Sequence, residues 1–228
     1  MTDPISGIEM CVFDAYGTLY DFNSAVARHR TAIGARADAL SEMWRSKQIQ
    51  YTWLRNSMAA YAPFWQVTGE ALDHCLAAHA ITDPSVRDKL MGAYLALDPF
   101  PEVPAMLDRL ARGGVRSAIL SNGNPEMLEP MVKASGLADR FDAVLSVDAV
   151  GAFKVDPRVY ALVEARCGVR PDKVCFLSSN CWDAHGAAQF GFTVVWVNRA
   201  SAPDDNLPGR IAAQVKDLSH LPALLGVA

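Results

Sequence analysis

Five short apolar runs, each followed by polar or turn-forming residues, are the feature that most constrains the fold of this chain. They cover residues 8–14, 115–120, 143–147, 174–178 and 193–198. Helical patterns at 126–135, 157–167 and 183–190 separate the later runs. Because strands that alternate with helices form parallel sheets buried between helical layers, we expect an α/β fold with a parallel sheet.

The segment between the first two runs breaks this alternation. It shows helical patterns at 23–33, 39–60, 69–80 and 84–97 and no convincing strand. Asp98-Pro99-Phe100-Pro101 then leads back to the sheet, and prolines restrict the backbone at such a junction. We predict a core made of residues 1–20 and 98–228, and a helical cap of residues 21–97 inserted after the first strand.

Composition narrows the partners and the compartment. Hydrophobic residues make up 51% of the 228 positions and the formal net charge is −4, which fits a packed globular protein without affinity for nucleic acid or anionic lipid. The first residues lack a basic segment followed by an apolar one, and no apolar run has membrane-spanning length. Five cysteines without Cys-x-x-C or Cys/His ligand spacing predict neither a disulfide framework nor a zinc site. We therefore expect a cytoplasmic protein.

Polar residues stand at the ends of the predicted strands. Asp14 ends the first run, Ser121-Asn122 end the second, Lys154 comes shortly after the third, and Ser178-Ser179-Asn180 with Asp183 follow the fourth. In an open parallel sheet, ligands bind outside the carboxyl ends of the strands. These side chains are therefore predicted to meet in one site.

The ordered set of these motifs resembles the haloacid dehalogenase superfamily over essentially the whole chain, beginning with Asp14-Ala15-Tyr16-Gly17-Thr18-Leu19. The resemblance implies a Rossmann-like core, an inserted α-helical cap and Asp14 as the nucleophile. Most members are phosphatases with Asp-x-Asp and a late acidic pair that helps to hold magnesium. Here Tyr16 stands at the second acidic position, and Ser178-Ser179-Asn180 replace the late carboxylates.

These departures agree with one chemistry. An alcohol leaving group needs a proton donor, whereas a halide leaves as a stable anion. Magnesium neutralises phosphoryl oxygens, but a haloacid carries only one negative charge. We therefore predict a dehalogenase that uses no metal and no other cofactor, with Lys154 and Arg45 supplying the positive charge that Asp14 and an anionic substrate require.

Residues 40–55, which include Arg45, resemble the L-2-haloacid dehalogenases specifically. That resemblance implies that Arg45, Asn122 and Phe64 surround the departing halide. It also implies that Ser121 and the backbone near Tyr16 hold the substrate carboxylate, and that Asp183 orients or deprotonates the hydrolytic water. The predicted catalytic residues are Asp14, Thr18, Arg45, Lys154, Ser178, Asn180 and Asp183, and the predicted substrate-binding residues are Ala15, Tyr16, Arg45, Ser121, Asn122, Phe64, Tyr160 and Trp182.

In the predicted reaction, Asp14 displaces the halide at C2 of a short (S)-2-haloacid, and water then hydrolyses the aspartyl ester to release an (R)-2-hydroxyacid. The resemblance also implies a homodimer. Two alternatives remain open: a magnesium-dependent phosphatase of the same superfamily, and a non-catalytic binding module on this fold. Tyr160 and Trp182 have a structural alternative, which is packing in the core.

Overall fold

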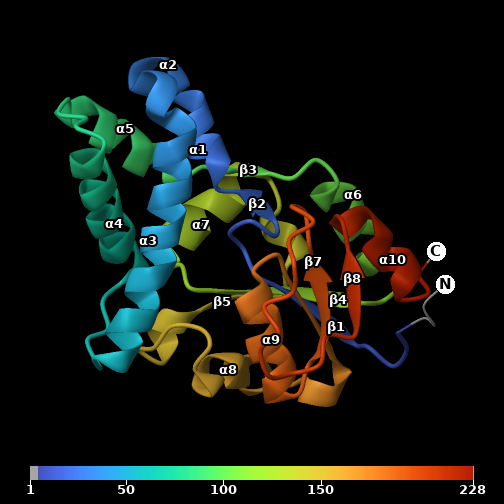
Figure 1. Ribbon diagram of the computed structural model, residues 1–228. Helices are drawn as coiled ribbons and strands as arrows, with labels where there is room; N and C mark the ends of the chain where they lie inside the picture. The colour runs from blue at the N-terminus through green and yellow to red at the C-terminus, as the bar shows by residue number, and fades with distance from the viewer. Residues whose placement is uncertain (1–4, 228) are drawn as a thin grey trace.

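The computed structural model describes residues 5–227, and its centre is a six-stranded parallel sheet (Figure 1). The strand order is β5-β4-β1-β6-β7-β8. Five strands come from the predicted apolar runs, which confirms the α/β fold, whereas the short edge strand β8 was not predicted. The bounds are β1 Met10–Phe13, β4 Arg116–Ser121, β5 Ala143–Ser146, β6 Val174–Ser178, β7 Thr193–Val197 and β8 Ala213–Val215.

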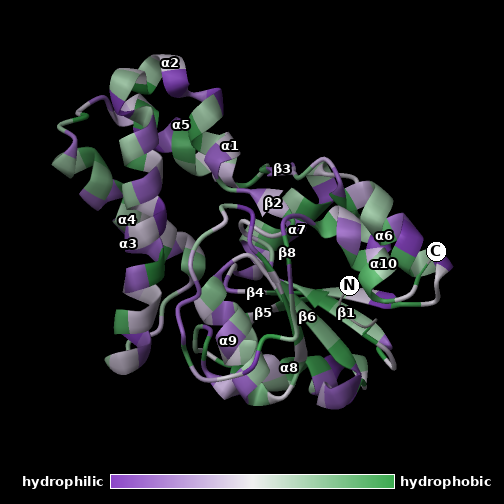
Figure 2. Ribbon diagram, turned by 45° about the vertical axis from the view of Figure 1, so that its right-hand side comes forward, coloured by the Kyte–Doolittle hydropathy of each residue, from purple (hydrophilic) through white to green (hydrophobic). Residues whose placement is uncertain are grey.

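Strand β1 occupies the middle of the sheet and has no exposed residue, because parallel strands are covered on both faces. Phe13, its last residue, pairs with Ile119 of β4 and with Leu177 of β6. The three strands therefore end at one edge of the sheet, and Asp14 comes directly after β1. Figure 2 shows the hydrophobic colouring of β1 and β6.

Helices cover both faces of the sheet. Figure 1 shows α6, α7 and α10 above it and α8 and α9 below it. Helix α8 begins at an N-cap, Asp156, whose side chain accepts from the Arg158 N–H, and it ends at Gly168 in the left-handed conformation. The bounds are α6 Val103–Arg112, α7 Pro125–Ala134, α8 Pro157–Cys167, α9 Cys181–Phe190 and α10 Leu221–Leu224.

The segment predicted as a cap is helical and lies beside the sheet (Figure 1). Its helices are α1 Asn23–Arg28, α2 Arg30–Ile33, α3 Ala37–Ser57, α4 Phe64–Ala78 and α5 Pro84–Tyr94. Strands β2 (Tyr20–Asp21) and β3 (Asp98–Pro99) pair antiparallel where the chain leaves the sheet region and returns to it. The exact division into two units stays a prediction, and its outermost residues, 1–4 and 228, lie outside the described part.

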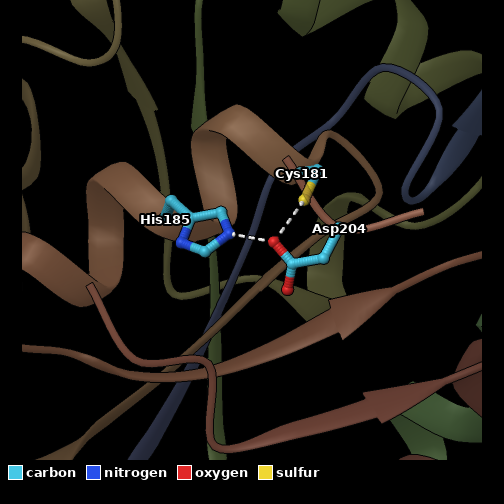
Figure 3. Close-up of side chains that lie close together, drawn as sticks. All are labelled: Cys181, His185 and Asp204. Atoms are coloured by element: carbon cyan, nitrogen blue, oxygen red, sulfur yellow. Dashed lines mark hydrogen bonds and ion pairs between the residues drawn. The ribbon is translucent and has the colours of Figure 1, made fainter. Parts of the chain in front are cut away.

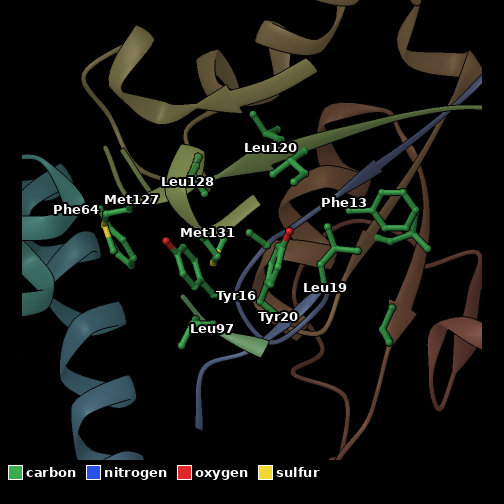
Figure 4. Close-up of a cluster of buried hydrophobic side chains, with 14 of the residues drawn as sticks. Phe13, Tyr16, Leu19, Tyr20, Phe64, Leu97, Leu120, Met127, Leu128 and Met131 are labelled. Carbon is green, nitrogen blue, oxygen red and sulfur yellow. The ribbon is translucent and has the colours of Figure 1, made fainter. Parts of the chain in front are cut away.

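An apolar layer joins the helical segment to the sheet region. Figure 4 shows Tyr16 between Phe64 of α4 and the side chains of α7. The Tyr16 ring centroid lies 5.7 Å from that of Phe64 and 5.4 Å from that of Tyr94. Burial of such aromatic surface holds the two parts together. None of the described helices has the length and apolar character needed to cross a membrane.

Candidate active site

Asp14 lies at the carboxyl edge of the sheet and is almost completely buried. Its Oδ1 accepts a hydrogen bond from Lys154 Nζ at 3.0 Å, and its Oδ2 accepts one from Asn180 Nδ2 at 2.8 Å. The hydroxyls of Thr18 and Ser178 lie 3.3 and 3.5 Å from Oδ2. Four predicted residues therefore surround this carboxylate with one charge and several donors.

Lys154 is fully buried and lies between two carboxylates. Its Nζ is 3.0 Å from Asp14 and 2.8 Å from Asp183. Burial alone would lower the pKa of the ammonium, but the charges and hydrogen bonds of the two aspartates outweigh it and raise that pKa. The two carboxylates therefore favour the charged form of Lys154, and one positive charge is shared by two acids.

Asp183 is also fully buried, on the first turn of α9. Burial raises the pKa of this carboxyl, the charge of Asp14 raises it further, and Lys154 and the Tyr160 hydroxyl lower it again. The Tyr160 hydroxyl donates to Asp183 Oδ1 at 2.8 Å. A carboxylate with a raised pKa is a better base than an exposed one. Tyr160 thus contacts the predicted base, and its predicted contact with the substrate stays a prediction.

The loop after β6 is held to the loop after β1. The Ser179 N–H donates to Thr18 Oγ1 at 2.7 Å, and the Asn180 N–H donates to Ser178 Oγ at 3.1 Å. These bonds orient the two hydroxyls that face Asp14. Thr18 and Ser178 therefore position the carboxylate and its surroundings.

Arg45 reaches the site from α3. Its Nη2 donates to Asn180 Oδ1 at 3.2 Å, so Asn180 bridges Arg45 and Asp14. The guanidinium lies 4.9 Å from the centroid of the Phe22 ring, a cation–π contact. The structure therefore brings the cation of the helical segment to the carboxyl edge of the sheet.

Gln48 is a site residue that sequence reasoning missed. Its Oε1 accepts from Arg45 Nη1 at 2.8 Å and from the Tyr94 hydroxyl at 3.2 Å. Its Nε2 donates to Thr68 Oγ1 at 2.8 Å, and Thr68 donates to the Phe64 carbonyl at 2.7 Å. The i,i+3 spacing of Arg45 and Gln48 was the available signal, because it places both on one face of a helix.

Other predicted residues lie around this centre. Ser121, at the end of β4, accepts from the Gly123 N–H at 3.0 Å, and Asn122 Oδ1 accepts from the Lys154 N–H at 3.0 Å. Ala15, Tyr16 and Phe64 are buried between the sheet and the helical segment. Their direct contacts with a substrate remain predictions.

Trp182 points to a different place. Its ring packs edge-on against Trp53 of α3, with centroids 5.4 Å apart. It also lines an open groove of about 790 Å³ with Val155 and Leu207. The substrate-binding role of Trp182 stays a prediction, and in this arrangement the ring belongs to the outer surface of the site.

A second cluster of reactive side chains lies on a different face of α9 from Asp183. Cys181 and His185, one turn apart on α9, approach Asp204 of the following loop (Figure 3). Among residues 5–227, these three side chains form the one group whose donor atoms lie close enough together to share a metal ion. From the sequence we expected no Cys/His ligand spacing, and we missed the i,i+4 pair of Cys181 and His185, which lies on one face of α9.

Known proteins match most of the length of this chain. The family model described as haloacid dehalogenase-like hydrolase matches residues 8–191. The chain is 45% identical to (S)-2-haloacid dehalogenase 4A of Burkholderia cepacia over 222 residues, which cover 97% of this chain and 96% of the relative.

Two solved structures share the fold closely. A dehalogenase with an intermediate complex superposes with a TM-score of 0.95 at 44% identity, covering 98% of this chain and 100% of the other. The L-2-haloacid dehalogenase of Xanthobacter autotrophicus with chloropropionic acid covalently bound superposes with a TM-score of 0.90 at 39% identity, covering 96% and 98%.

Proposed function

The chain belongs to the haloacid dehalogenase-like hydrolases, and from that premise we propose that it is an (S)-2-haloacid dehalogenase. The observation that carries this function is the surroundings of Asp14 at the end of β1. Lys154 and Asn180 contact its carboxylate, and Tyr16 stands where a phosphatase would place an acid for the leaving group. The substrate is a short (S)-2-haloacid and the product is the (R)-2-hydroxyacid.

In the first step, one oxygen of Asp14 attacks C2 from the side opposite the halogen. A carbon–oxygen bond forms, the carbon–halogen bond breaks, and the halide leaves with the bonding pair toward Arg45 and Asn122. Lys154 and Arg45 offset the repulsion between two anions, and fixed charges at a buried site do this without reorganisation. The configuration at C2 inverts.

In the second step, water attacks the ester carbonyl of Asp14. Asp183 accepts a proton from this water, a role that its raised pKa favours. The Tyr160 hydroxyl holds Asp183 in place. The bond between the carbonyl carbon and the ester oxygen then breaks, and Asp183 returns the proton to the departing oxygen, so that Asp14 and Asp183 are restored and the hydroxyacid is released.

The substrate carboxylate binds near Ser121 and the backbone of Ala15 and Tyr16. Supporting this position, the Tyr16 hydroxyl is buried and has no hydrogen-bond partner among the described residues. An orphaned buried hydroxyl is costly, so a bound ligand that accepts from it would gain affinity. Burial also raises the pKa of Tyr16, which keeps this hydroxyl a donor.

Halide release tests the function. We expect release from L-2-chloropropionate and not from the D-enantiomer, unaffected by EDTA and abolished in Asp14→Asn. Asp148→Asn, at a carboxylate after β5 that contacts Tyr61, serves as the matched control and should retain activity. Magnesium-dependent phosphate release from phosphate esters, without halide release, would support the phosphatase alternative instead.

The helices α1–α5 act as the cap, because Arg45 and Phe64 come from them while Asp14 comes from the core. The cap also supplies the surface for a homodimer: Trp53 and Leu54 of α3 and Met58, the C-cap residue that follows it, are 42%, 49% and 70% exposed. Such apolar exposure on one helix is typical of an interface. Sedimentation of a Leu54→Glu/Met58→Glu variant should change from dimer to monomer.

The compartment we propose is the cytoplasm. The five cysteines all lie in the described part of the chain and none is in a disulfide. Four of them, Cys11, Cys75, Cys175 and Cys181, are buried, as expected for reduced thiols that pack as small hydrophobic groups.

A further inference from the structure

Cys181, His185 and Asp204 form a cluster that the dehalogenase reaction does not use. Cys181 and His185 lie on one face of α9, and Asp204 comes from the loop that follows β7 (Figure 3). One donor atom from each side chain, a sulfur, a nitrogen and an oxygen, lies within 4.8 Å of the other two.

The contacts of His185 require either a proton or a metal ion between its Nε2 and Asp204. Its Nδ1 is 3.0 Å from the Gly209 carbonyl, which only accepts, so Nδ1 carries a hydrogen. Its Nε2 is 2.8 Å from Asp204 Oδ1. In a neutral imidazole, Nε2 then presents a lone pair to a carboxylate oxygen, and two lone pairs require a proton or a metal ion between them.

The hydrogen bond from His185 Nδ1 to the Gly209 carbonyl is of the kind that orients metal-binding histidines. A ligating imidazole generally donates its other N–H to a carbonyl or carboxylate, which fixes the tautomer. The loop backbone packs closely here, because a Cβ at Gly209 would lie 2.5 Å from the His185 carbonyl oxygen. The carbonyl of Gly209 is therefore held against the helix.

Cys181 supplies the third donor. Its Sγ lies 4.0 Å from Asp204 Oδ1 and accepts from the Asp205 N–H at 3.5 Å. This backbone N–H favours a thiolate, and burial raises the pKa of the thiol when no cation is present. A metal ion would replace the thiol proton.

We propose that Cys181, His185 and Asp204 bind a borderline-soft divalent cation of the Zn²⁺ type, with water as the fourth ligand. Sulfur, imidazole and carboxylate donors suit Zn²⁺ and are poor ligands for Mg²⁺ or Ca²⁺ as a set. Zinc bond lengths place tetrahedral donors about 3.3–3.7 Å apart. The present separations of 2.8 Å (N–O) and 4.0 Å (S–O) reach that range with small movements of Asp204, whose side chain is 47% exposed.

This site differs from the reaction centre in position and role. Asn180, the N-cap residue of α9, contacts Asp14, and Asp183 on the first turn contacts Lys154, whereas Cys181 and His185 face the loop that carries Asp204. A bound ion would tie that loop to α9. Halide release with EDTA present therefore does not test this proposal, which needs a direct binding measurement.

The first test measures binding of Zn²⁺ to metal-free protein by competition with a chromophoric chelator. We expect one equivalent, with affinity at least tenfold lower in Cys181→Ser and in Asp204→Asn. Asp204 is exposed, so its replacement leaves the fold intact even where a change at Cys181 disturbs it. Cys167→Ser and His74→Gln, outside the cluster, are the matched controls and should bind as the native chain does.

Cobalt gives the second readout. Co²⁺ bound at this cluster should show a thiolate-to-cobalt charge-transfer band that Cys181→Ser abolishes and Cys167→Ser retains. Absence of Zn²⁺ binding, or a band and affinity unchanged in Cys181→Ser and Asp204→Asn, would overturn the proposal.

Discussion

Replacing Lys154 by methionine removes the cation that lies between two buried carboxylates. The ammonium contacts Asp14 at 3.0 Å and Asp183 at 2.8 Å. At an effective dielectric constant of about 20, each contact corresponds to roughly 5–6 kcal/mol of gross attraction. Desolvation offsets much of this, and breaking a buried pair costs about 3–5 kcal/mol. We expect the free energy of unfolding at pH 7.5 to fall by about that amount.

The loss should depend on pH. Burial and Asp14 already raise the pKa of Asp183, and removal of Lys154 raises it further. A carboxyl whose pKa is raised by folding contributes most stability below its unfolded pKa, and that contribution is lost as the pH rises through the folded pKa. The deficit of Lys154→Met should therefore be smaller at pH 5 than at pH 7.5.

Urea unfolding at the two pH values measures both effects. The double variant Lys154→Met/Asp183→Asn removes one of the stranded charges and should recover part of the lost stability at pH 7.5. Lys216→Met, at an exposed lysine, is the control and should change stability by less than about 0.5 kcal/mol. A deficit below about 1 kcal/mol, or one that is equal at both pH values, would refute the reasoning.

Other predictions concern the displacement of the halide and the hydrolysis of the ester. Gln48→Leu removes the acceptor that orients Arg45. Because a hydrogen bond to a charged group contributes about 1.5–3 kcal/mol, kcat should fall by about 10- to 100-fold. Substrate binding measured by stopped-flow should change little. Gln50→Leu, at an exposed glutamine of the same helix, should leave kcat unchanged. Asp183→Asn should lower the rate of ester hydrolysis by about 10²–10⁴-fold, so that the Asp14 ester accumulates and is detected by mass spectrometry. Because the pKa of Asp183 is raised, kcat in the native chain should fall on the acid side at a pH above the usual carboxyl range; a flat profile there would contradict its role as base.

Local sequence patterns predicted the sheet well because apolar runs in central parallel strands are continuous. The run at 8–14 contains β1, and the residue after it, Asp14, falls at the sheet edge as expected. The edge strand β8 was missed because its three residues are only partly buried and carry no apolar run. Helix α4 begins at Phe64, earlier than the predicted 69, because its N-cap residue is Pro63 and no capping side chain marks its start in the sequence.

The contacts of the site were less predictable, because they join elements that are distant in the sequence. Arg45 was identified by resemblance, but its partner Gln48 depends on Thr68 and Tyr94, which come from two other helices. Asp204 was not predicted as a site residue for the same reason: it lies on a loop that carries no motif and approaches α9 only in the folded chain. Residue types at the strand ends predicted which side chains meet in the site. The hydrogen-bond partners of these side chains could not be predicted, because they depend on how the helices pack against one another.

The central claim is that Asp14 forms an ester that water opens at the aspartyl carbonyl. A single turnover in H₂¹⁸O, with enzyme in excess over L-2-chloropropionate, tests it most directly. We expect ¹⁸O to enter the peptide that contains Asp14, and the hydroxyl group of the first-turnover product to carry ¹⁶O. An unlabelled Asp14 peptide together with ¹⁸O in the product hydroxyl would mean direct attack by water on C2 and would contradict it.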